Sequence, residues 1–139
     1  MQRDLKKMVL GMIREHEGFR QFPYKDTVGI LTVGYGRNLV HNGISRTEAN
    51  YLLVRDVDRC YAKLHQWFVD WDDFELNRQA ALIDMCFNLG WDGFLKFEKM
   101  IEAIREKCWN VAADEAKQSK WFGQVGKRAE EIVHLLRYG

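Results

Sequence analysis

The sequence predicts a mainly helical α+β fold, in which one small β-hairpin interrupts an otherwise helical chain. Apolar residues recur at helical spacing over most of the 139 residues. Between residues 18 and 36 this pattern gives way to short extended runs separated by glycine-containing turns. The length fits a single domain, and a hydrophobic content of 47% is sufficient for a buried core.

The first predicted helix directly precedes the hairpin. Its apolar face consists of Leu5, Met8, Val9, Met12 and Ile13, and Gly18 is expected to end it. The hairpin strands are predicted near residues 22–24 and 30–33, joined by a turn at residues 26–29. Gly34 and Gly36 are expected to close the hairpin.

The remainder of the chain is predicted to be helical. Ser45 and Glu48 form an S-x-x-E capping box, which indicates the start of a helix that continues to about Trp67. A helix near residues 77–88 is hydrophobic almost all round, so it is expected to be central and buried. Further helices are predicted near residues 94–107, 109–117 and 125–138.

Charge and hydropathy exclude two classes of protein. A formal net charge of +1 is not that of a polybasic nucleic-acid binder. Residues 1–25 and 117–139 each carry a net charge of +3, which either forms a basic face for an anionic polymer or belongs to ordinary solvated helix faces. The longest apolar stretch of the N-terminal region, residues 8–13, is too short for a membrane span, and no secretory signal is recognised.

No cofactor or metal site is expected. The three cysteines, Cys60, Cys86 and Cys108, form no C-x-x-C motif, and because each lies among apolar residues they are predicted to be reduced, buried thiols. The four histidines are scattered along the chain. His16-Glu17 begins like the zinc motif H-E-x-x-H, but position 20 is Arg.

Two carboxylates frame the predicted hairpin. Glu17 ends the first helix, Asp26 lies at the turn, and Thr32 is on the returning strand. Glycoside hydrolysis needs one carboxyl group to protonate the leaving oxygen and a second, ionised group across the bond. Acidic residues near turns are also commonly solvated or serve as caps, so the spacing alone leaves both interpretations open.

Longer motifs carry a family resemblance. Around the hairpin they are Glu17-Gly18-Phe19-Arg20, Tyr24-Lys25-Asp26-Thr27-Val28-Gly29 and Thr32-Val33-Gly34-Tyr35-Gly36. Residues 45–49, 56–58, 81–90 and 109–121 and the pair Arg128-Ala129 extend the match in order over nearly all of the chain. The sequence resembles the phage-type lysozymes (endolysins) of glycoside hydrolase family 24.

The resemblance implies a lysozyme-like fold with a cleft between two lobes. A small lobe, about residues 18–45, would carry the hairpin. A larger helical lobe, about residues 46–139, would also include the first helix. The segment between Gly36 and Ser45 is much shorter than in the T-even phage members of the family, which implies a trimmed small lobe.

The activity implied by the resemblance is hydrolysis, with inversion, of the β-1,4 bond between N-acetylmuramic acid and N-acetylglucosamine in bacterial peptidoglycan. By matching position, Glu17 is the general acid, Asp26 orients or activates water and supports charge, and Thr32 holds the water. Phe87, Asn88 and Trp121 match cleft or near-cleft positions that bind substrate, although Phe87 and Trp121 are equally consistent with core residues.

Supporting contacts are also implied by matching position. Arg128 corresponds to the family's arginine that pairs with the catalytic Glu. Arg37 and Asp56 correspond to a His–Asp ion pair of relatives, and they are predicted to link the hairpin end to the long helix.

Two alternatives to hydrolysis remain at this point. A lytic transglycosylase can work with one Glu and no water-holding Asp, and the retained Asp26 and Thr32 favour hydrolysis over it. A non-catalytic lysozyme fold that only binds the cell wall is the second alternative, and the intact trio argues against it.

The family also implies partners and a location. The expected partner is a peptidoglycan glycan strand, with no nucleic acid and no stable membrane association, and the protein is expected to be a monomer. It is expected to stay in the host bacterial cytoplasm until a holin-type permeabilising partner gives it access to the wall.

Overall fold

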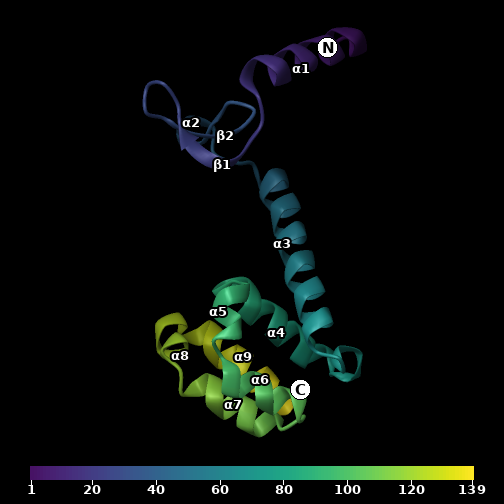
Figure 1. Ribbon diagram of the computed structural model, residues 1–139, viewed down its shortest axis with the longest axis vertical. Helices are drawn as coiled ribbons and strands as arrows, with labels where there is room; N and C mark the ends of the chain where they lie inside the picture. The colour runs from purple at the N-terminus through teal and green to yellow at the C-terminus, as the bar shows by residue number, and fades with distance from the viewer. The chain divides into compact units, whose positions relative to one another are not determined.

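The computed structural model describes all 139 residues and divides the chain into two compact units, Met1–Asn50 and Tyr51–Gly139 (Figure 1). The boundary falls inside one continuous helix, α3 (Arg46–Trp67). Helices dominate, and the strands form one three-stranded antiparallel sheet in the order β1-β2-β3. The predicted mainly helical α+β fold is therefore confirmed. The predicted lobe boundaries, with the first helix joined to the helical lobe, stay a prediction.

The N-terminal unit begins with α1 (Arg3–Glu17), which ends at Gly18 as expected. The predicted hairpin is formed by β1 (Arg20–Lys25) and β2 (Leu31–Gly34). In the register of the sheet, Thr32 lies opposite Tyr24 on one side and opposite Asn38 on the other. Thr32 is therefore on the central strand.

Two short elements of this unit were not predicted. After β2 the chain forms β3 (Arg37–Asn38) and then a single helical turn, α2 (Leu39–Asn42). The side chain of Asn38 caps this turn by accepting a hydrogen bond from the backbone N–H of His41 at 2.9 Å. Both elements are too short to give a periodic sequence signal.

Burial in the N-terminal unit is slight. Within residues 1–50 only Thr32 is buried, and none of the side chains of α1 is buried. The unit therefore provides no cover for the apolar face of α1, and a second surface is needed to remove that face from water.

The predicted capping box is confirmed at the start of α3. The backbone N–H of Ser45 donates to Glu48 Oε1 at 2.9 Å, and the backbone N–H of Glu48 donates to Ser45 Oγ at 3.1 Å. These two bonds satisfy donors that the first helical turn leaves free, which explains why the helix begins here.

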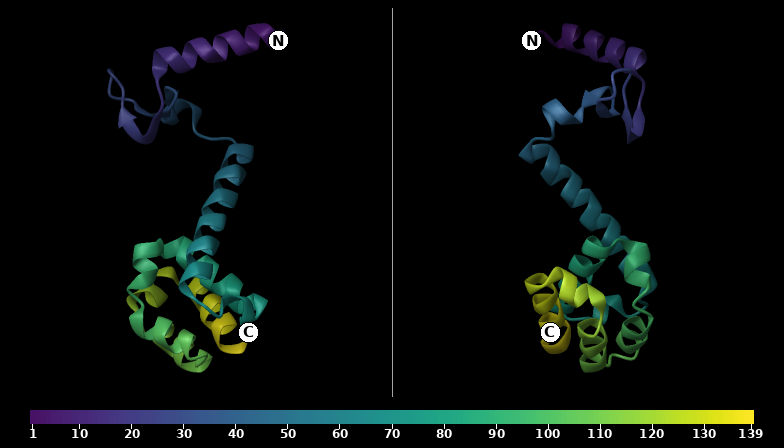
Figure 2. Two further views of the ribbon diagram at one scale, coloured as in Figure 1. Left: turned by 45° about the vertical axis from the view of Figure 1, so that its right-hand side comes forward. Right: turned by 90° about the vertical axis from the view of Figure 1, so that its left-hand side faces the viewer.

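The second unit holds the hydrophobic core. After α3 it contains η1 (Trp71–Asp73), α4 (Leu76–Leu89), α5 (Trp91–Leu95), α6 (Glu98–Arg105), α7 (Trp109–Lys117), α8 (Lys120–Val125) and α9 (Lys127–Tyr138). The C-terminal helix α9 packs against α4 and α7, as Figures 1 and 2 show. The largest fully buried side chains of this unit include Trp71, Phe68, Phe94, Leu82 and Leu136.

Two predicted helices are each divided in the structure. The predicted helix 94–107 is interrupted at Lys96 and Phe97, where the backbone of Phe97 (ψ 57°) leaves the helical region between α5 and α6. Gly126, with φ 72° and ψ −127°, separates α8 from α9, so the predicted helix 125–138 begins later. A periodic pattern that continues across one non-helical residue hides such breaks.

Arg78, in the first turn of α4, fastens the end of α9. Its Nε and Nη2 donate to the backbone carbonyls of Leu136 and Arg137, both at 2.9 Å. Its guanidinium also lies over the Trp109 ring, with Cζ 4.7 Å from the ring centroid. These contacts satisfy carbonyls that a helix C-terminus otherwise leaves unpaired.

The cysteine prediction is only partly confirmed. Cys86 is buried and Cys60 is half-buried, but Cys108 is exposed, so the prediction of a buried thiol is wrong there. Cys108 directly precedes α7 and follows the charged residues Glu106 and Lys107, so burial inferred from apolar neighbours does not hold at this position.

Truncating a core side chain should lower the free energy of unfolding more than truncating a surface side chain of the same unit. Leu136 is 0% exposed and Val69 is 98% exposed. We expect Leu136→Ala to lower the free energy of unfolding by about 2–5 kcal/mol, because it removes buried methyl groups and leaves a cavity. Val69→Ala should change it by no more than about 0.5 kcal/mol. Urea denaturation of both variants checks this, and equal losses would contradict the assignment of the core.

Candidate active site

The turn between β1 and β2 fixes the side chain of Asp26. Its Oδ1 accepts two backbone hydrogen bonds, from Val28 N–H at 3.0 Å and from Ile30 N–H at 2.8 Å. The second carboxylate oxygen, Oδ2, takes part in neither bond. The carboxylate is therefore held in one orientation with an acceptor oxygen to spare.

The backbone of Ile30 connects Asp26 with Thr32. The Ile30 carbonyl accepts from the backbone N–H of Asp26 at 2.9 Å and from Thr32 Oγ1 at 2.8 Å. Thr32 is only 4% exposed and is the one buried polar side chain of the chain. The two predicted polar groups are thus fixed by the N–H and C=O of a single residue.

Glu17 reaches the sheet at the turn that follows β2. It is the last residue of α1, and Gly36 in the turn leaves room for its side chain. A Cβ added at Gly36 would lie 2.6 Å from Glu17 Oε2 and 2.7 Å from its carboxyl carbon. The structure therefore places the Glu17 carboxyl group over the backbone of Gly36, in the same unit as Asp26 and Thr32.

Aromatic contacts support this placement of the end of α1. The rings of Phe19 and Tyr35 lie with their centroids 5.6 Å apart. The guanidinium of Arg14, one turn before Glu17, lies 6.0 Å from the Tyr35 ring centroid. Tyr35 directly precedes Gly36, so these contacts hold the helix end beside the turn.

Arg37 contacts the segment that leads into α3. Its Nε donates to the Gly43 carbonyl at 2.9 Å, and its Nη2 lies 3.5 Å from Glu48 Oε1. The pKa of Glu48 is lowered, first by the backbone hydrogen bond from Ser45, then by the Ser45 hydroxyl, with a smaller contribution from the charge of Arg37. Glu48, which was not predicted as a partner of Arg37, thus belongs to both the cap and this ion pair.

The second unit contains the residues predicted to bind substrate. Phe87 is 39% exposed, and Asn88 is also exposed. Trp121 is buried, and its indole N–H donates to Asn88 Oδ1 at 2.8 Å. Trp121 also meets Phe97 edge to face, with centroids 6.0 Å apart. The structure therefore brings Asn88 and Trp121 together and leaves Phe87 accessible.

The remaining supporting residues each have a partner within the second unit. Arg128 Nε donates to Asp84 Oδ1 at 2.8 Å, and Arg128 Nη2 also contacts this carboxylate. Asp56 lies 3.9 Å from Arg59, one turn along α3. The predicted pairs of Arg128 with Glu17 and of Arg37 with Asp56 join residues of different units, so they stay predictions.

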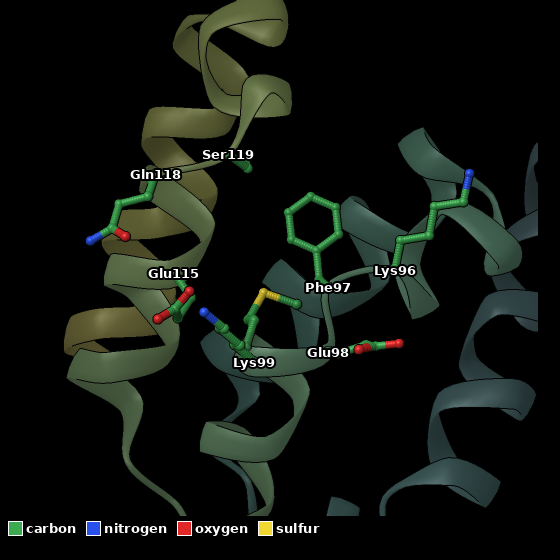
Figure 3. Close-up of a pocket in the computed structure, with 8 residues that line it drawn as sticks. Lys96, Phe97, Glu98, Lys99, Glu115, Gln118 and Ser119 are labelled. Carbon is green, nitrogen blue, oxygen red and sulfur yellow. The ribbon is translucent and has the colours of Figure 1, made fainter.

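One pocket of the second unit lies apart from the predicted substrate-binding residues. It has a volume of about 440 Å³ and is lined by residues of α6, the segment before it and the end of α7. Figure 3 shows Phe97 and the charged side chains of Lys99 and Glu115 around it. Phe97 connects the cavity with Trp121, but Phe87, Asn88 and Trp121 do not line it.

Three residues of the site escaped the sequence analysis. Ile30 acts through its backbone, Gly36 through the absence of a side chain, and Asp84 as an acidic residue within a helix that reads as apolar. Of these three residues, only Gly36 had a recognisable sequence signal, because it is the second of the two glycines expected to close the hairpin.

No group of three or more His, Cys, Asp and Glu side chains is arranged to hold a metal ion. None of the helices has the length and apolar character needed to cross a membrane.

Comparisons with known proteins identify the family of this chain. The family described as phage lysozyme matches residues 14–134. Two relatives from Dictyostelium discoideum, "Probable T4-type lysozyme 2" and "Probable T4-type lysozyme 1", are 26% and 24% identical, with 92% of this chain and 92% of each relative covered. The pre-baseplate central spike protein Gp5 of Enterobacteria phage T4 is 27% identical over 92% of this chain, which spans 27% of that longer protein. Since the family match extends over most of the sequence and includes Glu17, Asp26 and Thr32, the chain belongs to the phage lysozyme family of peptidoglycan-cleaving glycoside hydrolases.

Proposed function

We propose that this lysozyme hydrolyses the β-1,4 bond between N-acetylmuramic acid and N-acetylglucosamine with inversion, and that Glu17, Asp26 and Thr32 carry the reaction. The observation that supports this most directly is the shared attachment of Asp26 and Thr32 to the Ile30 backbone. It fixes two groups that can bind water within one hairpin, and a single-displacement reaction needs a carboxylate that activates the attacking water.

Glu17 is the general acid of this mechanism. Its carboxyl group ends α1 and lies over Gly36, where no side chain separates it from the sheet. In the protonated form it donates its proton to the glycosidic oxygen as the bond to the leaving sugar breaks. The positive charge that develops on the remaining sugar is then open to attack by water from the opposite face.

Asp26 and Thr32 position that water. Asp26 Oδ1 is occupied by two backbone donors, so Oδ2 is the oxygen that accepts a proton from the water. The Thr32 hydroxyl donates its hydrogen bond to the Ile30 carbonyl. The lone pairs of Oγ1 are therefore free to accept a hydrogen bond from the second hydrogen of the water. The ionised Asp26 also stabilises the positive charge on the sugar.

Substrate binding in the second unit is assigned to exposed groups. Phe87 offers an accessible ring and Asn88 an amide N–H₂, while Asn88 Oδ1 is held by the Trp121 indole. Trp121 is therefore a positioning residue, because its ring is buried and acts on the substrate only by orienting Asn88. Arg128 is proposed to pair with Glu17 while Asp84 anchors its guanidinium.

Release to the cell wall is proposed to depend on a partner. Membership of the phage lysozyme family supports a cycle in which the monomeric enzyme stays in the host bacterial cytoplasm until a holin-type protein permeabilises the membrane. The peptidoglycan glycan strand is then its substrate outside the membrane.

Removing the acid should abolish most of the activity. We expect Glu17→Gln to lower the rate of peptidoglycan digestion by about 10²–10⁴-fold, because amides do not donate a proton to the leaving oxygen. The matched control is Glu15→Gln, since Glu15 lies about 200° round the same helix. It should retain nearly the native rate. Turbidity loss of purified peptidoglycan measures both variants, and circular dichroism checks that both are folded.

The products of the same digest test the mechanism. Inversion gives a reducing-end sugar of opposite anomeric configuration to the cleaved bond, which proton NMR detects before mutarotation. A retained configuration or a 1,6-anhydro product would contradict water attack directed by Asp26. A folded Glu17→Gln protein with near-native activity would contradict the assignment of the acid.

A methyl group at Gly36 should displace the acid. Gly36 and Gly34 have φ values of 70° and 68°, so alanine strains the backbone similarly at both. The new Cβ clashes with Glu17 at Gly36, whereas at Gly34 it has open space around it. We expect Gly36→Ala to lower kcat about 10–100-fold more than Gly34→Ala, because small misplacements of a catalytic group are costly. Equal losses of kcat in the two variants would refute a positioning role for Gly36.

Cell lysis should require membrane damage. We expect bacteria that express the native chain alone to keep their optical density, and to lyse within minutes once a holin or chloroform permeabilises the membrane. Cells that express Glu17→Gln should keep their wall and their optical density after the same permeabilisation. Rapid lysis on expression of the native chain alone would rule out dependence on a permeabilising partner.

A further inference from the structure

Two of the three cysteines line the same cavity of the helical unit. Cys60 lies on α3 and Cys86 on α4, and both line one cavity of about 280 Å³. Neither residue belongs to the proposed catalytic or substrate-binding set. Cys108 does not line this cavity and is exposed, so it can be replaced without altering the pair.

The two thiols differ in access. Cys86 is 1% exposed, whereas Cys60 is half-buried and packs against the edge of the core. Burial raises the pKa of the Cys86 thiol to about 12, and the charge and hydrogen bond of the adjacent Cys60 act in the same direction, with Lys63 opposing them. At neutral pH, Cys86 is therefore a protonated thiol beside a second thiol that solvent reaches more readily.

Either cysteine alone would be an ordinary small core residue. Two adjacent thiols on different helices, both open to one cavity, are in addition the two reactants of a disulfide bond. Arg59 and Lys63 also line the cavity, while Asp56 is its one acidic group and lies 3.9 Å from Arg59. Its net positive charge favours the approach of an anionic reagent.

We propose that Cys60 and Cys86 form a redox-active dithiol, which a small anionic disulfide of the glutathione type converts into an intramolecular disulfide. The thiolate of Cys60 attacks one sulfur of glutathione disulfide, forming a mixed disulfide and releasing one glutathione thiolate. Cys86 then transfers its proton to the glutathione thiolate released in the first step, and its sulfur attacks Cys60 Sγ and displaces the second glutathione. Two protein thiols are oxidised, and one glutathione disulfide is reduced to two thiols.

The bond would tie α3 to α4 around a large part of the core. The loop that it closes, residues 61–85, includes Phe68, Trp71 and Phe74, all of which are buried. A cross-link across about 25 residues restricts the unfolded chain much more than the folded one. The oxidised protein should therefore melt at a higher temperature than the reduced protein, by roughly 5 °C or more.

The test uses the full chain with Cys108→Ser, which leaves only the proposed pair. The protein is equilibrated with glutathione disulfide, quenched in acid and alkylated, and its peptides are then mapped by mass spectrometry. We expect loss of both thiols, a mass lower by two hydrogens, a Cys60–Cys86 linked peptide and the higher melting temperature. Dithiothreitol should restore both thiols and the original melting temperature.

Two variants separate the steps. Cys86→Ala should stop at a glutathione adduct on Cys60, and Cys60→Ser should form neither the adduct nor the cross-link. Persistence of two free thiols in Cys108→Ser, a stable glutathione adduct without a cross-link, or a disulfide between two chains would overturn the proposal. An oxidised form that melts no higher than the reduced form would overturn the stabilising role.

Discussion

The proposed chemistry depends on the peptide groups at one residue, Ile30. Its N–H holds the Asp26 carboxylate and its C=O holds the Thr32 hydroxyl, so the distance between these two groups is set by main-chain geometry and not by flexible side-chain packing. Because both bonds lie within one turn of a three-stranded sheet, the arrangement can persist in a unit that buries very little. Groups aligned before the substrate binds need no reorganisation when charge develops.

The two units contribute different physical properties to the enzyme. The N-terminal unit carries the residues proposed as the acid and as the water-binding groups, with Thr32 as its buried side chain. The second unit supplies the aromatic and aliphatic core, and it presents Phe87 and Asn88 at its surface. Polar side chains support these groups indirectly, as Trp121 does for Asn88 and Asp84 for Arg128. The proposed acid and water-binding residues and the hydrophobic core thus lie in different parts of the sequence.

Local patterns predicted the elements whose signals are local. The C-terminal end of α1 and the start of α3 followed from Gly18 and from the Ser45–Glu48 box, because caps are encoded in neighbouring residues. The breaks at Phe97 and Gly126 were missed, since hydrophobic periodicity persists on both sides of one non-helical residue. The exposure of Cys108 was also missed, because sequence patterns do not fix the direction of a side chain at a helix start.

The residues of the candidate site also differ in whether the sequence could predict them. Carboxylate spacing alone left Glu17 and Asp26 ambiguous, and the family resemblance supplied their roles together with that of Thr32. Ile30 and Gly36 could not be predicted, because they contribute a peptide group and an empty space, which the identity of a side chain does not reveal. Pairs that join distant helices, such as Arg128 with Asp84, depend on tertiary packing and carry no sequence signal of their own.

The contacts of Arg78 limit which substitutions this position can accept in evolution. An exchange of arginine for lysine usually ranks among the mildest in evolution, yet Arg78 serves two successive carbonyls of α9 and covers the face of Trp109 at once. A lysine ammonium is a compact charge with no planar face, so it could satisfy one of these tasks but not all three. Descendants of this chain should therefore keep a guanidinium at this position, or replace it only together with residues around Trp109 and the end of α9.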